Sequence, residues 1–499
     1  MYDNTPLSLL YQHMTATTMF TRSRTKSFFA LAGLGVAIFI FGLWSSLLSS
    51  PKPRIEVTID IETSQPTTEY LVDTIENTSK YFLDYPLGDD KFGEMGRRVD
   101  ILGDWLRMSV EPKFNLQERE IITTQAERLA QSLFPFLPQS FISTHFGNVS
   151  SESRGIVIPS GVATFRYACH LVSCLREVLH STVPIQIVYA GDTDLPSSYR
   201  EIIVSLAPEV ETLDILTVFN DNNLAFWKSG WAIKPFAILA SKFQHVLLLD
   251  ADAVFLQPPE TIFESHEGYH ETGTLLFHDR LLWKGHFQDR HKWWREQMKH
   301  RQPSDTLLKS LVYTEDYAEE GDSGVVVMDK GRLPVLLGLL HTCWQNTLSV
   351  REKWTYRLTY GDKESWWFGF ELTGAPYSFE AHYGSIVGST VHHEGNASEV
   401  CGFTIAHLDY RDRLLWYNGS LLKNKKVDAM EFEVPTHWMT DGVWWKGSDR
   451  SEMSCMSETI LRTLDATEIG ILEESVRIAQ EVDQRLRQEE EREIDLEGN

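Results

Sequence analysis

The stretch "FQHVLLLDADAVFLQPPE", residues 243–260, joins an apolar run to two aspartates, Asp250 and Asp252, that stand one residue apart. The apolar run predicts a buried strand that ends on these two carboxylates. Like charges this close repel unless a cation lies between them, and hard divalent cations prefer oxygen ligands. A surface turn, where aspartate is common, is the alternative. The strand end favours a ligand-binding role for the pair.

Alternating strand and helix patterns surround this stretch. From Gly155, "GIVIPS" predicts a strand, "VATFRYACHLVSCLREVLH" a helix and "VPIQIVYAG" a second, parallel strand with a right-handed crossover. Four further strands are expected at "LDILTVF", "HVLLLDAD", "GTLLFHD" and "SGVVVMDK", with the helix "GWAIKPFAILASKF" before the second of these. We therefore predict an open, mostly parallel α/β sheet. Ligands bind beyond the carboxyl ends of such strands, which is where Asp250 and Asp252 lie.

Composition narrows the class of protein. The chain has 499 residues and a formal net charge of −24, which argues against nucleic-acid binding because phosphate contacts need a basic face. Its five cysteines have neither a CxxC pair nor zinc-ligand spacing, and an odd, sparse count is not a disulfide framework. A lumenal protein could form one or two disulfide bridges among them, and the sequence does not show which cysteines pair.

The N-terminal third predicts a membrane-anchored organisation. Residues 28–48 are uncharged and long enough to cross a bilayer, with a basic flank before them that favours a cytosolic N-terminus. A cleaved signal peptide is the alternative. We expect a cytosolic tail (1–27), a transmembrane signal anchor (28–48), a stem (49–115), a lumenal catalytic domain (116–465) and an acidic helical tail (466–499). Four N-x-S/T sequons, at Asn77, Asn148, Asn396 and Asn418, fit a lumenal location.

Several motifs together resemble a known family. They are "RGIVIPSG", "LPSSYRE", "GWAIKPFAILASKFQHVLLLDADAVFLQPPE", "YHETGTLLFHDR", "DSGVVVMDK", "GDKESWWFGFEL" and "HLDYRDRLLWYNGS". In this order they resemble the fungal Golgi α-mannosyltransferases of the Mnn1/Mnn2 type, glycosyltransferase family 71. The resemblance implies a GT-A nucleotide-sugar-binding fold, a GDP-mannose donor, a divalent cation (usually Mn²⁺) and type II membrane topology in the Golgi.

The metal site expected from this resemblance has three ligands. Asp250 and Asp252 are two of them, and Asp250 could instead reach a ribose hydroxyl. His407 is the candidate third ligand, because its segment is similar to the histidine motif of glycogenin-like GT-A enzymes. A hydrogen-bonded histidine on a strand is the alternative. Asp409 is expected to assist His407 or to orient it.

Donor and catalytic residues are predicted in four further segments. Lys234 is expected at the donor diphosphate, unless it only extends to water, and its neighbour Trp231 is expected in the core. Asp362 is the first choice for a catalytic carboxylate and Glu364 the second, although either could simply favour the helix start. One of the two tryptophans that follow could stack on a sugar. The other predicted donor-site or catalytic residues are Asp322, Ser323, Gly324, Trp416, Asn418 and Gly419, while Asp279, Arg280, Asp192 and Asp194 are weaker candidates.

These observations predict a metal-dependent, retaining mannosyltransferase. It would move mannose from GDP-mannose to mannose-terminated glycans of secreted or cell-wall glycoproteins, with an α-1,3 linkage expected. Two alternatives are an α-1,2-mannosyltransferase of the same family and a non-catalytic lumenal glycan-binding subunit. We also expect a possible complex with other Golgi glycosyltransferases, and no nucleic-acid partner.

Overall fold

The computed structural model describes residues 67–142, 144, 152–228, 230–392 and 398–497. The predicted membrane anchor at 28–48 lies outside these residues. Within them, no helix is both long enough and apolar enough to cross a bilayer. Residues 68–499 form one compact unit, which contains every element described below.

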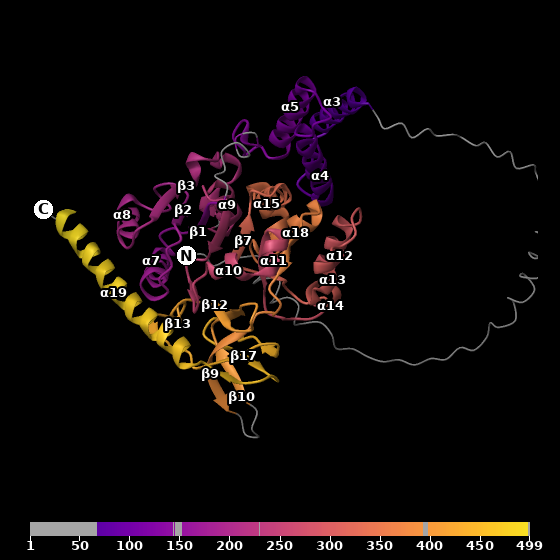
Figure 1. Cartoon of the computed structure of the whole chain (residues 1–499). Coiled ribbons are helices and arrows are strands. Elements are labelled where there is room, and N and C mark those ends of the chain that lie inside the picture. The colour runs from indigo at the N-terminus through magenta and orange to yellow at the C-terminus, as the bar shows by residue number, and fades with distance from the viewer. Residues whose placement is uncertain (1–66, 143, 145–151, 229, 393–397, 498–499) are drawn as a thin grey trace, which may run out of the picture. The chain divides into compact units, whose positions relative to one another are not determined.

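A seven-stranded mixed sheet lies at the centre of this unit (Figure 1). Strands β3, β2, β1 and β4 are parallel, β7 is antiparallel to β4 and β6, and β8 is parallel to β6. The prediction of a mostly parallel α/β sheet is therefore confirmed. In spatial order the strands are β3 (Val210–Asp214), β2 (Ile185–Tyr189), β1 (Arg154–Pro159), β4 (His245–Leu249), β7 (Gly321–Asp329), β6 (Thr274–His278) and β8 (Ser378–Phe379).

One predicted strand is shorter than expected. The segment 213–219 continues β3 for only two residues and then turns into a 3-10 helix, η2 (Ile215–Thr217). The cause is local, because the Asp214 carboxylate accepts a hydrogen bond from the backbone N–H of Leu216 at 3.0 Å and thereby ends the strand.

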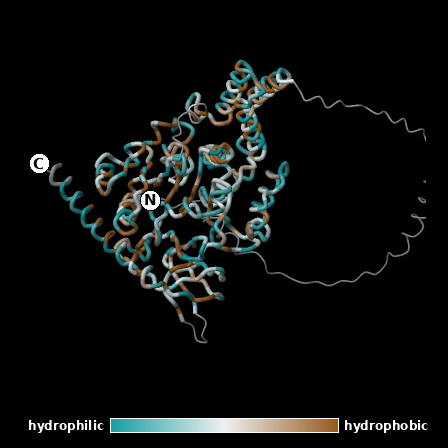
Figure 2. Tube along the Cα trace, in the orientation of Figure 1, coloured by the Kyte–Doolittle hydropathy of each residue, from teal (hydrophilic) through white to brown (hydrophobic). Residues whose placement is uncertain are grey.

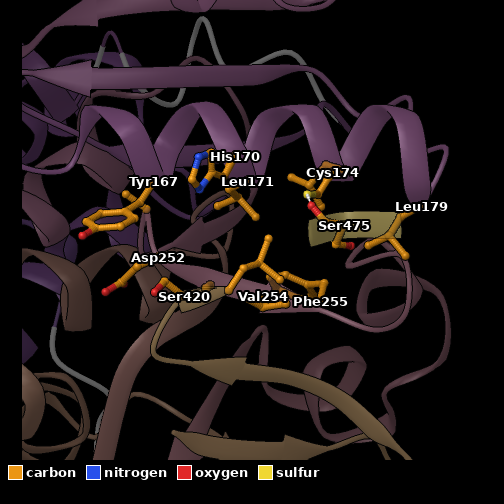
Figure 3. A pocket seen from close by; sticks show the side chains of 14 residues that line it. Tyr167, His170, Leu171, Cys174, Leu179, Asp252, Val254, Phe255, Ser420 and Ser475 are labelled. Carbon is orange, nitrogen blue, oxygen red and sulfur yellow. Dashed lines mark hydrogen bonds between the residues drawn. The ribbon is translucent and has the colours of Figure 1, made fainter. Parts of the chain in front are cut away.

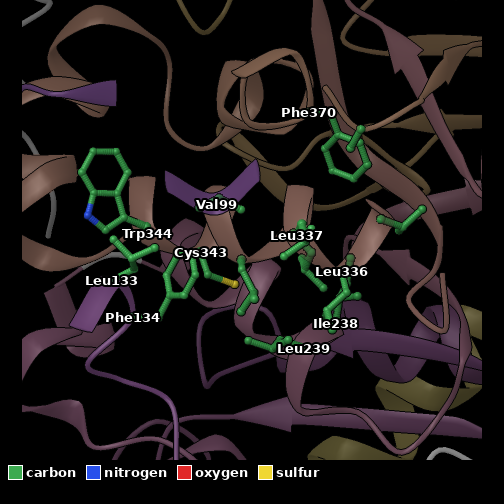
Figure 4. Close-up of a cluster of buried hydrophobic side chains, with 14 of the residues drawn as sticks. Val99, Leu133, Phe134, Ile238, Leu239, Leu336, Leu337, Cys343, Trp344 and Phe370 are labelled. Atoms are coloured by element: carbon green, nitrogen blue, oxygen red, sulfur yellow. The ribbon is translucent and has the colours of Figure 1, made fainter. Parts of the chain in front are cut away.

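Helices cover both faces of the sheet. On one face, α9 (Ile233–Ala240), α15 (Leu333–Gln345) and α18 (Lys363–Thr373) share a large apolar core, part of which is drawn in Figure 4. On the other face, α7 (Phe165–Ser173) packs against the opposite side chains of β1, β2 and β4. Since both faces are buried, the central strands are apolar at successive positions, as the runs "GIVI" and "VLLL" indicated.

Part of the segment predicted as stem is folded. Helices α3 (Thr68–Asp84) and α4 (Phe92–Ser109) lie in this segment, and α5 (Leu116–Leu133) begins the part predicted as the catalytic domain. All three contribute buried side chains to the same core as α15 and α18. Their buried positions, such as Val72, Ile75 and Phe82 on α3, recur at helical spacing. Because the polar positions between them are numerous, the periodicity is weak in the sequence, and the segment resembles a linker.

The C-terminal part adds small sheets. β10 and β17 pair through Cys401 opposite Cys455, which form a disulfide. Cys169, Cys174 and Cys343 are free and buried. The strands are β9 (Ile386–His392), β10 (Ser398–Gly402), β15 (His437–Met439), β16 (Val443–Trp445), β17 (Ser454–Ser457) and β18 (Arg462–Thr463) in a six-stranded sheet, β5 (Ala253–Phe255), β11 (Ile405–Leu408) and β12 (Leu414–Asn418) in a three-stranded sheet, and β13 (Leu422–Asn424) with β14 (Asp428–Phe432).

Helix α19 (Ala466–Glu497) ends the described chain. The helix packs on α7 as far as Asp483, whose carboxylate is bonded by the Arg166 guanidinium and by His170. Its C-terminal end is mostly hydrophilic and extends away from the body of the unit (Figures 1 and 2). The remaining helices are α8 (Ser197–Ser205), α10 (Thr261–Ser265), α11 (Glu267–Thr272), α12 (Gln288–Gln297), α13 (Asp305–Lys309), α14 (Leu311–Glu315), α16 (Leu348–Val350) and α17 (Tyr356–Leu358), with π-helical turns η1 (Cys174–Val178) and η6 (Arg351–Thr355) and 3-10 turns η3 (Asp221–Asn223), η4 (Phe226–Lys228) and η5 (Gly230–Ala232).

Candidate active site

The carboxyl end of β4 carries the two aspartates, as predicted. The backbone N–H of Asp250 donates to the carbonyl of Gly324 on β7 at 2.8 Å, which continues the sheet by one residue. A turn follows, closed by the N–H of Ala253 on the Asp250 carbonyl at 3.0 Å. The turn separates the two carboxylates, whose side chains are 23% and 21% exposed, so both are reachable from solvent.

Lys234 is the central cation of this site. It comes from the first turn of α9, is 5% exposed, and its Nζ lies 2.7 Å from Asp250 Oδ1 and 3.9 Å from Asp362 Oδ1. The same ammonium donates to the carbonyl and the hydroxyl of Ser323 at 3.0 and 3.2 Å. Burial disfavours the ammonium charge, but the two carboxylates outweigh burial and raise the pKa of Lys234. The alternative that Lys234 extends to water is therefore wrong.

Electrostatics favour a cation beside the two aspartates. Burial raises the pKa of Asp250 to about 6, against the opposing charge of Lys234, and repulsion from Asp252 adds to the rise. The carboxylate of Asp252 is bonded by the Lys425 ammonium. Carboxylate oxygens are the ligand type that a divalent cation takes, so the chemistry of this pair fits a metal that replaces the two ammonium groups.

Asp252 also lines a small cavity between α7 and β5 (Figure 3). Its side chain lies at the end of the cavity near Tyr167 and Ser420, while Cys174 and Ser475 lie at the other end. The cavity holds about 20 Å³, the space of roughly one water molecule. It is therefore too small for a sugar.

His407 contacts a different carboxylate from the one predicted. Its ring lies on β11 and stacks on Trp416 of β12, with centroids 4.3 Å apart. Its Nε2 lies 3.1 Å from Asp322 Oδ2, and both side chains are 1% exposed. Although burial favours protonation, the hydrogen bond from His407 and the charge of Lys363 hold the pKa of Asp322 well below its usual range. The carboxylate is thus ionised, and His407 is the donor.

The three predicted metal ligands do not converge. In the part of the chain that the structure describes, Asp250, Asp252 and His407 are not among the groups whose ligand atoms lie mutually within 4.8 Å. Asp409, predicted to assist or orient the histidine, instead accepts from the Arg413 guanidinium at 2.9 Å. The carboxylate that holds His407 is Asp322.

Side chains of this protein lie close against Gly324, one of the predicted donor-site residues. A Cβ on Gly324 would lie 2.8 Å from the Trp416 ring and 2.8 Å from the Asn418 amide nitrogen. Trp416 is fully buried, so its ring packs against Gly324 from the interior of the protein. Asn418 faces Gly324, and Gly419 follows it with φ of 145°, a conformation that favours glycine.

Asp362 and Glu364 face different neighbours at the start of α18. Asp362 stands at the N-cap position but makes no capping hydrogen bond, because its Oδ2 accepts from the Trp366 indole at 2.8 Å and its Oδ1 faces Lys234. Glu364 accepts from the backbone N–H groups of residues 320 and 321 and from the Trp367 indole. Burial raises the pKa of Glu364 to about 8. Glu364 thus fixes the start of β7, one residue before Asp322.

Several contacts were missed by sequence reasoning. One of them is the ion pair between Lys363 Nζ and Asp279. The other oxygen of Asp279 accepts from Arg280, and this pairing was favoured from the sequence over a phosphate contact for Arg280. Trp231, expected in the core, is 39% exposed. Lys425 had no sequence signal, since it stands among other lysines in a polar loop.

A family model matches the part of the chain that carries these residues. The family model Mannosyl_trans3, whose description is mannosyltransferase, matches residues 153–409, slightly more than half of the chain. The chain therefore belongs to this mannosyltransferase family. Asp250, Asp252, Asp322 and His407 all lie within the matched range.

Similar curated proteins carry a more specific name. The chain is 29% identical over 297 residues to alpha-1,3-mannosyltransferase MNT3 of Saccharomyces cerevisiae, covering 52% of this chain and 45% of that protein. It is 23% identical to alpha-1,3-mannosyltransferase MNN1 of the same yeast, covering 60% and 44%. The chain spans about half the length of the curated relatives it matches.

Solved glycosyltransferases are more distant. The galactosyltransferase LgtC has 12% identity and a TM-score of 0.29, covering 45% of this chain and 72% of its own. Mouse xyloside xylosyltransferase 1 has 12% identity and a TM-score of 0.29, covering 46% and 84%. Scores this low carry no argument about fold or function.

Proposed function

We propose that the chain is a retaining GT-A mannosyltransferase that transfers mannose from GDP-mannose to a mannose-terminated glycan of secreted or cell-wall glycoproteins. The observation that carries the proposal is the cluster of Lys234, Asp250 and Asp362 at the carboxyl end of β4, within a mannosyltransferase family. The α-1,3 linkage is proposed because the similar curated proteins are named alpha-1,3-mannosyltransferases.

In this proposal the chain supplies charge and position. Lys234 offers a buried ammonium at the strand end, where it can donate to a diphosphate oxygen in place of Asp250. Asp322, held ionised by His407, accepts from the backbone N–H of Gly324 and so helps to position the strand that faces the donor sugar in this proposal. Either Asp362 or the departing phosphate can take the proton of the acceptor hydroxyl.

A divalent cation, Mn²⁺ by the family resemblance, is the proposed cofactor. Asp250 and Asp252 would hold it, without His407 in the arrangement seen here. When bound, such a cation stabilises the negative charge of the leaving diphosphate. A Golgi location, by the family resemblance, and one transmembrane helix, from the composition of residues 28–48, are likewise part of the proposal.

Transfer of radiolabelled mannose from GDP-mannose to mannobiose, with and without Mn²⁺, tests the proposal. We expect product only with active protein and cation, and linkage analysis of that product should show α-1,3-mannose. The absence of transfer with every metal tried would favour a non-catalytic glycan-binding subunit. Asp252→Ala should abolish Mn²⁺-dependent donor binding, measured by calorimetry, and unchanged binding would contradict the assignment of Asp252.

A further inference from the structure

Two large aromatic side chains lie exposed beside the candidate active site. Trp231 is 39% exposed and Tyr360 is 53% exposed. Trp231 stands three residues before Lys234, and Tyr360 stands two residues before Asp362. Since Lys234 and Asp362 face each other at 3.9 Å, the aromatic pair adjoins the charged cluster.

The pair has a defined geometry. The ring centroids of Trp231 and Tyr360 lie 5.2 Å apart with their planes inclined by 48°. Gly361, with φ of 70°, lies against the indole so closely that a Cβ there would be 2.7 Å from Trp231 Cε3. A side chain at residue 361 would therefore displace the indole, and glycine is required both for space and for conformation.

The segments that precede the two rings meet at one buried cation. Arg351, with no exposed surface, donates to the carbonyls of Leu224 and Ala225. It also donates to the carbonyl of Asn346, whose side chain accepts from the hydroxyl of Tyr356. The rings themselves are placed by their contact with each other and by the indole against Gly361. Aromatic rings placed in advance form a surface that binds at low entropic cost.

We propose that Trp231 and Tyr360 form a platform for a pyranose ring of the acceptor glycan, beyond the mannose that receives the new sugar. The inference rests on the proposed function and names the part of the substrate that this surface binds. Apolar C–H faces of a sugar pack on aromatic rings, whereas an exposed tryptophan with no ligand leaves its apolar surface in contact with water.

The position of the pair favours the acceptor over the nucleotide. The strand order reverses between β1 and β4, and nucleotides bind in the crevice at such a reversal. Tyr360 and Asp362 instead lead into α18, whose first residue Lys363 lies against Gly321 of β7, on the far side of β4. An inclined, solvent-exposed pair also suits a glycan that continues outward.

Acceptor kinetics with mannose oligosaccharides of increasing length test the proposal in the full chain. Trp231→Ala and Tyr360→Ala should each raise the KM for a mannotetraose by about tenfold, the range of one aromatic contact. The KM for GDP-mannose and the kinetics with methyl mannoside should not change. Trp231→Phe, which keeps a ring, should restore most of the affinity for the tetraose.

Matched controls are available on other surfaces. Alanine replaces Trp445, which is 60% exposed on β16, or Tyr85, which is 61% exposed after α3. Neither change should alter any KM. Thermal melting shows whether each variant is folded, and Tyr360→Ala leaves the contact between Trp231 and Gly361 in place.

The outcomes separate the inference from the proposed function. A raised KM for GDP-mannose, or an unchanged KM for the tetraose, would overturn the platform. If the wild-type protein transfers no mannose, the proposed function fails, while calorimetric binding of the tetraose to wild type and Trp231→Ala still decides whether Trp231 binds glycan.

Discussion

Replacing Lys234 by methionine tests the electrostatic basis of the site. The ammonium lies 2.7 Å from Asp250 Oδ1 and donates to Ser323, with Lys234 only 5% exposed. Its removal leaves Asp250 and Asp362 close together without the cation between them. Breaking a buried ion pair by removing one partner costs about 3–5 kcal/mol. We expect the lower end of that range, since Asp250 is partly exposed and its loss of charge by protonation limits the penalty.

Urea denaturation at pH 7 and at pH 5 measures the loss. The loss should be smaller at pH 5, because Asp250 already binds a proton below its pKa of about 6. Adding Asp250→Asn to Lys234→Met should recover part of the stability. Lys330→Met is the matched control, because Lys330 is also buried but lies at the other end of β7, bonded to carbonyls that include those of Ile238 and Leu239.

The control should lose stability but keep its mannosyltransferase activity per folded molecule, whereas Lys234→Met should lose both. A loss below about 1 kcal/mol for Lys234→Met would refute the reasoning, since that is the value of an exposed pair. Equal losses at both pH values would show that Asp250 is not the group that takes up the proton.

Two further predictions concern pH. Asp322→Asn should cost about 1.5–3 kcal/mol at pH 7, the value of a hydrogen bond to a charged group. Because the folded pKa of Asp322 is depressed, this stability is present above its unfolded pKa and is lost as the pH falls, so denaturation curves of variant and wild type should converge in acid. The contribution of His382 to stability has the opposite pH dependence. Burial lowers its pKa, but hydrogen bonds to Asp412 and Asp441 outweigh burial and raise it. Its contribution is complete below pH about 6.5 and is lost as the pH rises through the folded pKa, so His382→Gln should flatten the decline in stability above neutral pH, measured by thermal melting.

Much of the fold could be predicted because its signals are local. The parallel strands are apolar runs that end on polar residues, and the DAD sequence marks the end of β4 without any knowledge of its neighbours. The folded helices α3 and α4 could not be separated from a stem. Helix α3 packs on α5, and α4 packs on partners more than 200 residues away, as with Phe92 against Trp293 and Trp344.

The candidate site was less predictable, because the partner that a side chain meets depends on the direction in which it points. Asp362 and Glu364 stand two residues apart in the first turn of α18, and residues at that spacing do not share a helix face. One therefore faces Lys234 while the other bonds the backbone before Asp322. The resemblance made one of the two a catalytic carboxylate, with Asp362 the first choice and Glu364 the second, and only the helix geometry shows which neighbours each of them has.

The charges of the site also explain how it can stay folded before a substrate binds. Asp250 is bonded to Lys234, Asp252 to Lys425, and Asp322 to His407, so each acid has a donor from a different element. A diphosphate entering at the strand end would compete with Asp250 for Lys234, and a cation would compete with Lys425 for Asp252. Each exchange replaces one ion pair by another, so the desolvation cost has already been met during folding. Binding energy is then available for placing the sugar, which is the condition for catalysis by position and charge.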